Sequence, residues 1–429
     1  MKNNVKNLIE FIDHSPSCFH VIENARKQFM DHGFIELKEK EYWNLEEGKS
    51  YFVTRNGSSI IAFHLPKKDF QGFHIVASHS DSPTYRIKEQ PEMRVENHYT
   101  KLNIERYGGM IPETWFDRPL SVAGRIIIEE NGQIKDQLVN VDRDLMIIPN
   151  LAIHMSRSSN ESKQLNPQKD LLPLCGGNLT KDGFEEMIAK ESGVEKEDIL
   201  SYDLFLYNRM RGTTLGINEE FVAAPKLDDL ECAYSSIEGM LNAKLSKDYV
   251  TVCAVFDNEE VGSGTKQGAG STFFPEVLKR ISYLCGKNEE EYYMAVADSF
   301  MLSADNAHAV HPNYQDKTDP TNRPYINEGI VLKYNASQKY TTDANSAALV
   351  KYLCKKEKIK CQVFFNRSDM LGGSTLGNIL TGQVSIKAAD IGLPQLSMHS
   401  TYETAGCKDL DDMITLMESF YELGKEVQI

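Results

Sequence analysis

A histidine and an aspartate follow an apolar segment that is typical of a buried strand. The segment 73–77 is followed by His79 and then Asp81. In open α/β sheets, ligand sites gather at the carboxyl ends of strands. A metal-bound imidazole needs its second nitrogen held by a carboxylate or carbonyl, and Asp81 could do this for His79. Taken alone, the pair favours a plainer interpretation, a loop histidine beside a capping aspartate.

A second apolar segment, 249–256, ends in a group of acidic residues. Asp257, Glu259 and Glu260 follow it within the string AVFDNEEVGSG. Adjacent carboxylates at a buried strand end repel each other unless a cation or proton compensates. A metal could ligate one of them, which would leave the other as a general base beside water. A solvated acidic loop is the alternative.

Further acids and histidines occur singly along the chain, and each is ambiguous. In APKLDDL, either Asp228 or Asp229 could bridge two metals or simply cap a helix, and the spacing does not separate them. Asp305 lies near His308 in SADNAHAVHPN, a combination that suits metal or substrate binding, with Asp298 as a competitor. His399 follows a strand-like run, a position in which a histidine is commonly structural.

The elements that must position these residues follow from the hydrophobic pattern. An apolar stripe from Val5 to Ile12, a break at Ser15-Pro16-Ser17 and a stop at Gly33 predict two N-terminal helices. The other segments that we assign are strands at 51–54, 59–63, 73–77, 249–256, 292–297 and 361–365, and helices at 228–243, 275–286, 342–356 and 409–425. Strands that alternate with helices predict a mixed or largely parallel sheet covered on both faces.

The middle of the chain has a different composition and hydrophobic pattern. Residues near 86 to 225 include β-rich, alternating segments with Gly and Asn turns, and a charged, helix-leaning stretch at 157–200. We expect an inserted domain at 86–225, between the two parts of an α/β domain formed by 1–85 and 226–429. The total of 429 residues also favours two domains over one core.

Composition narrows the classes of protein. The net charge of −15 disfavours a general nucleic-acid binder, which needs clustered Lys and Arg. No apolar run reaches the roughly 18 residues of a membrane span, and the N-terminus lacks the pattern of a secretory signal. Eight scattered cysteines without a CxxC pair argue against a disulfide scaffold and fit a reducing compartment. We therefore expect a cytoplasmic protein with no membrane partner.

Taken together, the motifs resemble those of the aspartyl aminopeptidase family, which includes vacuolar aminopeptidase I. They occur in family order over nearly the whole chain. The matching strings are SHSDSP, TWFDRPLSVAGR, IPNLAIHM, APKLDDL, FDNEEVGS, SADNAHAVHPNY, DMLGGSTLG and LSMHSTYE. Gly264 and Lys266 depart from the family pattern, and 157–200 has no match.

The resemblance implies a role for each candidate residue. It selects Asp228 over Asp229 and Asp305 over Asp298. The implied metal ligands are His79, Asp228, Glu260, Asp305 and His399, with Asp228 bridging. Glu259 corresponds to the catalytic glutamate, and Asp81 to the residue behind His79. The implied substrate contacts are His308, Lys333 and Tyr340, with His154 reaching across a dimer interface into the partner's site.

The resemblance also implies a zinc-exopeptidase-like catalytic domain with an inserted dimerisation domain, and dimers that assemble into a tetrahedral dodecamer. The expected activity is removal of N-terminal residues, Asp or Glu, from short peptides with a free N-terminus. The expected cofactors are two divalent ions, zinc, with cobalt or manganese as alternatives, because His and carboxylate ligands accept several metals. The competing functions are an aminopeptidase for neutral residues, a dinuclear deacylase and a non-catalytic scaffold.

Overall fold

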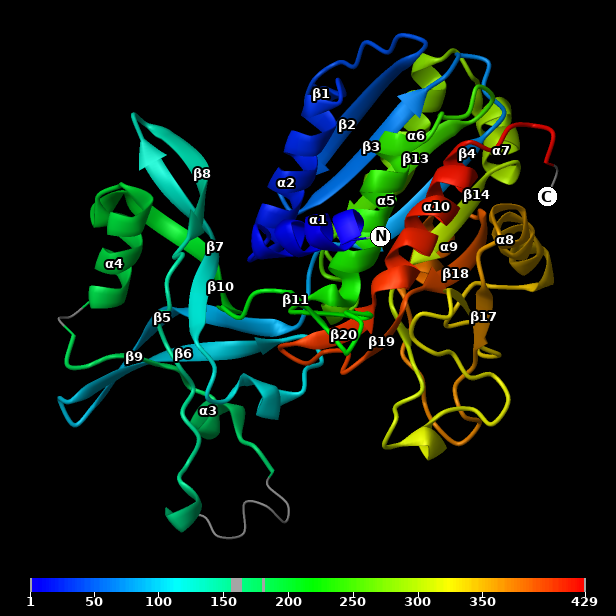
Figure 1. Cartoon of the computed structure of the whole chain (residues 1–429). Coiled ribbons are helices and arrows are strands. Elements are labelled where there is room, and N and C mark those ends of the chain that lie inside the picture. Colours follow the sequence, from blue (N-terminus) through cyan, green and yellow to red (C-terminus); the bar gives the residue numbers. More distant parts are fainter. Residues whose placement is uncertain (1, 156–163, 180–181, 428–429) are drawn as a thin grey trace.

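A nine-stranded mixed sheet forms the centre of the molecule (Figure 1). The computed structural model describes residues 2–155, 164–179 and 182–427. In spatial order the strands are β1 (Ile35–Leu37), β2 (Lys49–Arg55), β3 (Ser59–Leu65), β13 (Val250–Phe256), β4 (Phe73–His79), β14 (Phe300–Ala304), β18 (Lys387–Gly392), β16 (Ile330–Lys333) and β17 (Cys361–Phe364). The four neighbours β13, β4, β14 and β18 run parallel. Their carboxyl ends therefore meet at one edge of the sheet.

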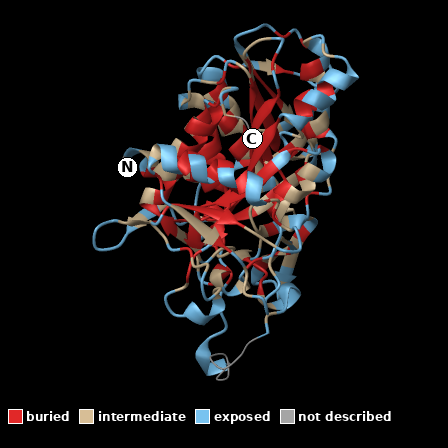
Figure 2. Cartoon of the chain, turned by 90° about the vertical axis from the view of Figure 1, so that its right-hand side faces the viewer, coloured by how far each residue is buried: buried red, intermediate tan, exposed pale blue. Residues whose placement is uncertain are grey.

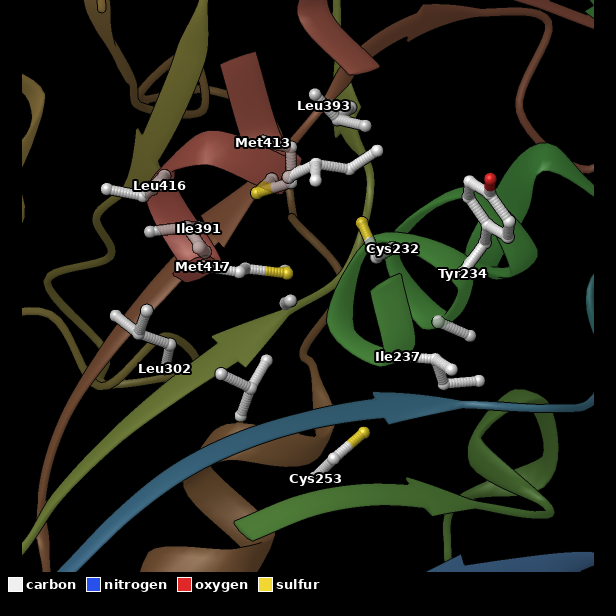
Figure 3. Packing of buried hydrophobic residues seen from close by; sticks show 14 of the residues in the cluster. Cys232, Tyr234, Ile237, Cys253, Leu302, Ile391, Leu393, Met413, Leu416 and Met417 are labelled. Carbon is white, nitrogen blue, oxygen red and sulfur yellow. The ribbon is translucent and has the colours of Figure 1, made fainter. Parts of the chain in front are cut away.

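Helices cover both faces of this sheet, as the alternating strand residues require. Val76 of β4 packs into one apolar cluster, and Ile75 and Ala77 pack into the other. The first face is covered by α1 (Lys2–Asp13), α2 (Cys18–Asp31), α5 (Leu227–Asn242), α8 (Ala344–Glu357) and α10 (Cys407–Tyr421). The second face is covered by α6 (Phe273–Leu284), α7 (Glu289–Ala297) and α9 (Leu376–Gln383). Figure 2 shows the buried residues concentrated along the sheet, and Figure 3 shows side chains of α5 and α10 packed over it.

An antiparallel six-stranded sheet stands beside the central one, with an apolar cluster of its own (Figure 1). Its strands in spatial order are β8 (Gln133–Asn140), β7 (Leu120–Glu130), β10 (Ile199–Asn208), β5 (Thr84–Val95), β6 (Tyr99–Tyr107) and β9 (Leu174–Gly176). The helices α3 (Pro167–Asp170) and α4 (Gly183–Ser192) also belong to this part of the chain. The predicted insertion 86–225 supplies nearly all of this sheet, and its role as a separate domain stays a prediction.

A small five-stranded sheet lies between the two larger ones. Its strands in spatial order are β11 (Thr213–Leu215), β12 (Phe221–Ala224), β20 (Glu403–Gly406), β19 (Pro394–Leu396) and β15 (Ala307–His308). The short 3₁₀ helices of the chain are η1 (Pro112–Trp115), η2 (Ile153–Met155), η3 (Lys196–Asp198), η4 (Glu259–Val261) and η5 (Gln315–Lys317). Because β12, β19 and β15 lie next to Asp228, His399 and Asp305 in sequence, this sheet carries three of the predicted site segments.

The mixed α/β fold that the sequence predicts is confirmed, but the prediction misses the strands β1, β14, β16 and β18 of the central sheet and contains one false strand. Residues 292–297 belong to helix α7 and are not a strand. The run Tyr292-Tyr293-Met294 has strand-like composition, but Asn288 and Glu291 form a capping box that starts a helix before it. Across the described ranges, no helix combines the length and apolarity that crossing a bilayer would need.

Candidate metal centre and active site

Three acidic or histidine segments meet at the carboxyl edge of the central sheet. His79 is the last residue of β4, and Asp305 directly follows β14. Glu259 and Glu260 form the start of η4, just beyond β13. Because β13, β4 and β14 are parallel neighbours, these side chains converge.

Two further residues reach the same place from the five-stranded sheet. Asp228 lies shortly after β12, at the start of α5, and its peptide bond to Asp229 is cis. His399 lies just beyond β19. The site is therefore assembled where two sheets meet.

Asp228 is at the centre of the cluster. Its Oδ1 lies 3.6 Å from Nε2 of His79, and its Oδ2 lies 3.2 Å from Nε2 of His399. Nε2 of His399 also lies 3.2 Å from Oε1 of Glu260. The two oxygens of one carboxylate thus face two different histidines, the arrangement expected of a bridging ligand.

All five predicted metal ligands and Glu259 are brought together. Their ligand atoms fall into three overlapping groups, within each of which all atoms lie within 4.8 Å of one another. The groups are His79, Asp228, Asp229 and Asp305; His79, Glu259 and Glu260; and Asp228, Glu260 and His399. Of the competing acids, Asp229 joins the cluster. Asp298 lies outside these groups and accepts a hydrogen bond from Tyr249.

The crowding of acids has an electrostatic cost. Burial raises the pKa values of Glu259, Glu260 and Asp305 above their ordinary values. Burial also acts to raise the pKa of Asp228, but the adjacent imidazoles of His399 and His79 outweigh it and hold that pKa below its usual range. The cluster therefore requires protons or cations to balance its charge.

The side chains fit divalent metal ions. Oδ1 of Asp228 and Oε1 of Glu260 are buried, and neither accepts a hydrogen bond from any described residue. Nδ1 of His79 lies 3.1 Å from the carbonyl oxygen of Asp81, so it can donate there while Nε2 faces the acids. Imidazole nitrogens and carboxylate oxygens are ligands that zinc accepts, and a hydrogen-bonded second nitrogen is usual for a ligating histidine.

Asp81 holds the backbone of η4 as well as facing His79. Its Oδ1 and Oδ2 accept hydrogen bonds from the backbone N–H groups of Glu259 and Glu260, both at 3.1 Å. Oδ2 also accepts from the hydroxyl of Tyr107 at 2.7 Å, and Oδ1 lies 3.4 Å from Nδ1 of His79. One carboxylate therefore orients three of the predicted site residues.

Two supporting contacts were not predicted from the sequence. Oδ2 of Asp229 accepts a hydrogen bond from the backbone N–H of His79 at 3.0 Å. Tyr107 comes from β6 of the six-stranded sheet, and nothing in its sequence context points to the metal centre. In the sequence, Asp229 is only an alternative to Asp228, and its contact with His79 was not predicted.

Three of the four predicted substrate residues line a cavity of about 290 Å³ beside the acids. His308, Lys333, Tyr340 and Glu259 are among its lining residues. The ammonium of Lys333 is buried and donates to the backbone carbonyls of Asp305 at 2.7 Å and Asn306 at 3.1 Å. It also lies 3.6 Å from Oδ2 of Asp305. Lys333 thus supports the metal side of the cavity while contributing its positive charge.

His154 lies elsewhere. It is an exposed residue of η2, and it is not among the residues that line this cavity. Its predicted role in a partner's site stays a prediction.

Comparison with known proteins places the chain in a family. The model of the family "Aminopeptidase I zinc metalloprotease (M18)" matches residues 11–421. "Probable M18 family aminopeptidase 2" of Clostridium novyi (strain NT) is 46% identical over 437 residues, covering 99% of this chain and 100% of the relative. A chain in the cryo-EM structure of the Ape4 and Nbr1 complex is 37% identical with a TM-score of 0.95, covering 98% of this chain and 85% of that one. The S. cerevisiae mApe1 dodecamer contains a chain that is 26% identical with a TM-score of 0.85, covering 98% and 97%. The chain therefore belongs to the M18 family of zinc metalloproteases and is an aminopeptidase.

Proposed function

We propose that this aminopeptidase uses two metal ions to remove N-terminal residues, with a preference for Asp or Glu, from short peptides. The observation that carries the proposal is the position of Asp228 between His79 and His399. In this arrangement His79 and Asp305 would hold one ion, and His399 and Glu260 the other, with Asp228 shared. Zinc is the expected metal, and cobalt or manganese could replace it.

Bound divalent ions would supply polarisation of the peptide carbonyl and a water whose pKa is lowered to about 7. Glu259 is the proposed general base. It lines the substrate cavity, and Asp81 fixes its backbone N–H. Its carboxylate would accept the proton of the attacking water and return it to the leaving amine. Asp81 contributes by fixing the position of Glu259 and the orientation of the His79 ring.

The preference for an acidic N-terminal residue is supported by Lys333. It is the only Lys or Arg among the described residues that line the cavity. A carboxylate of the substrate could accept a hydrogen bond from the remaining N–H of the Lys333 ammonium and pair with its charge, with His308 and Tyr340 beside it. The Lys333 ammonium lies 5.2 Å from the centre of the Tyr340 ring, so these two groups form one wall.

We further propose that 86–225 is a dimerisation domain and that dimers build a tetrahedral dodecamer in the cytoplasm. The dodecameric state of the S. cerevisiae relative supports the assembly. Large exposed side chains also gather beside His154: Leu151 is 51% exposed, Ile153 46% and Met155 75%. Light scattering tests this, and a monomer at working concentration would refute both the assembly and the role of His154 in a partner's site.

The activity is tested with Asp-, Glu- and Leu-p-nitroanilides and with N-acetylated Asp-p-nitroanilide, in parallel and with zinc, cobalt or manganese. The proposal predicts fastest hydrolysis of the acidic substrates and none of the acetylated one. Faster turnover of Leu would show a neutral-residue aminopeptidase. Turnover of the acetylated substrate would indicate a deacylase, and no turnover with any metal would leave only a scaffold role.

A further inference from the structure

Glu403 connects two of the proposed metal ligands through their backbones. It is a buried residue at the start of β20, with 1% of its surface exposed. Its Oε1 accepts a hydrogen bond from the backbone N–H of His399 at 2.6 Å, and its Oε2 accepts one from that of Asp228 at 3.0 Å. His399 and Asp228 lie far apart in the sequence, so this one carboxylate links the two segments.

The position of β20 in the five-stranded sheet explains how Glu403 reaches both. β20 pairs with β12 on one side, where Glu403 lies opposite Ala224, and with β19 on the other, where Thr404 lies opposite Leu396. β12 leads into Asp228, and β19 leads into His399. Glu403 therefore sits where the chain leaves both neighbouring strands for the metal centre.

The backbone of His399 adds a second reason for such a contact. His399 has φ = +67°, in the left-handed region that non-glycine residues seldom adopt. Conformations of this kind persist where the surroundings hold them, and they are common at functional sites. The short hydrogen bond from the His399 N–H to Glu403 is a direct restraint on that conformation.

The buried charge of Glu403 also supports a role at the metal centre. The carboxylate of Glu403 is stabilised by the two backbone N–H groups and by the charge of the neighbouring His399 imidazole, whereas the carboxylate of Asp228 repels it. A buried carboxylate that lies beside a second carboxylate is costly unless cations compensate it. Divalent ions held by the adjacent Asp228 and His399 would offset that cost. A role confined to packing would not require a charge at this position.

From these observations we infer that Glu403 is a positioning residue for the metal centre. It fixes the backbones of Asp228 and His399, and thereby the 3.2 Å separation between Oδ2 of Asp228 and Nε2 of His399. It does for this pair what Asp81 does for Glu259 and Glu260. The inference rests on the proposed ligand set and deepens it.

The test compares Glu403→Gln with a matched control, Asp409→Asn. Asp409 is also a fully buried carboxylate that accepts two backbone N–H bonds, from Asn327 at 2.6 Å and Gly329 at 2.8 Å, but it belongs to none of the groups that could hold a metal. Zinc affinity is measured by competition with a chromophoric chelator, and unfolding of the metal-free proteins by calorimetry.

We expect Glu403→Gln to weaken one zinc site by about 10- to 100-fold, the usual cost of losing a partner that orients a metal ligand. The amide keeps one acceptor oxygen but turns an N–H group towards a backbone donor. Asp409→Asn should bind both ions as the wild type does while losing stability in the metal-free form. Unchanged zinc affinity in Glu403→Gln, or an equal loss in both variants, would overturn the inference.

A second variant covers the case in which Glu403→Gln does not fold. Glu403→Asp keeps the charge but is too short to reach both N–H groups, so it should also lose affinity at one site, and wild-type affinity would overturn the inference. The wild-type protein separates this test from that of the proposed function. If the wild type does not bind two ions, the proposed function fails; if it does and the Glu403 variants bind them equally well, only the inference fails.

Discussion

The two halves of the active site are built differently. On the metal side, the proposed ligands lie at or shortly after the ends of strands, and the buried carboxylates Asp81, Asp229 and Glu403 accept hydrogen bonds from their backbones. On the substrate side, Lys333 of β16 and His308 of β15 line the cavity together with the connecting segments around Tyr340 and around Ser374. The metal side is thus anchored to the sheets, whereas part of the surface that contacts the substrate belongs to loops, which evolution can vary more freely.

The substrate side has a buried carboxylate anchor of its own. Asp390 of β18 is fully buried, and its Oδ2 accepts hydrogen bonds from the backbone N–H and the hydroxyl of Thr341 at 2.5 and 2.6 Å. Its Oδ1 accepts from the hydroxyl of Thr375 at 2.5 Å. Two loops therefore depend on one carboxylate, whereas the metal side depends on three.

Removal of metal should have the largest effect. Chelation is expected to abolish turnover and to lower the melting temperature, because the buried acids lose the cations that balance them. Ligand linkage gives about 4 kcal/mol of stabilisation at a free metal concentration 1,000 times the dissociation constant. Calorimetry before chelation, after it and after zinc is restored measures this. An unchanged melting temperature would contradict a metal role for the cluster.

Glu259→Gln is expected to lower kcat by about 10³-fold while the protein still binds both ions, because removal of a general base typically costs 10²- to 10⁴-fold. Steady-state kinetics with metal analysis of the same sample tests this. Full activity would refute the assignment of the base. Loss of an ion would show instead that Glu259 is a ligand, since it lies in one of the three close groups.

Lys333→Met should reduce kcat/KM for the Asp substrate by roughly tenfold or more relative to the Leu substrate, the value of a hydrogen bond to a charged group. Lys339→Met is the control, because Lys339 donates to the carbonyl of Gly372 on the neighbouring loop and lies outside the cavity lining. An equal fall for both substrates would mean that Lys333 serves only to hold the carbonyls of Asp305 and Asn306.

Asp390→Asn should have the smallest effect. It should affect the substrate side of the active site and leave the metal side unchanged. Loosening of the two loops is expected to raise KM about fivefold with little change in kcat, which corresponds to about 1 kcal/mol for the weakened hydrogen bonds. The KM and kcat of the Asp substrate and the zinc content are measured together. A fall in zinc content would show that the two halves are not separately anchored.

The sequence predicts the proposed metal ligands better than it predicts the residues that hold those ligands in place. His79 and Glu260 stand at or shortly after strands that the sequence predicts, so residue type and position together mark them. The strand before Asp305 is not predicted, and the family motif selects that residue. Asp228 and Asp229 could not be separated by spacing, and the structure shows why: both acids face His79.

The supports depend on contacts between segments that are distant in the sequence. The hydroxyl of Tyr107 reaches Asp81 only because the six-stranded sheet packs beside the central one. The role of Glu403 appears only in its hydrogen bonds to two backbones. In the same way, the helix at 289–297 depends on a capping box that outweighs the strand-like composition of the residues after it.

The proposed metal centre depends on Asp228 being shared by two ions. X-ray diffraction from zinc-loaded crystals, collected above and below the zinc absorption edge, tests it directly. We predict two anomalous peaks on either side of the Asp228 carboxylate, one beside His79 and Asp305 and the other beside His399 and Glu260. A single peak, or a peak ligated by Glu259 in place of Glu260, would contradict it.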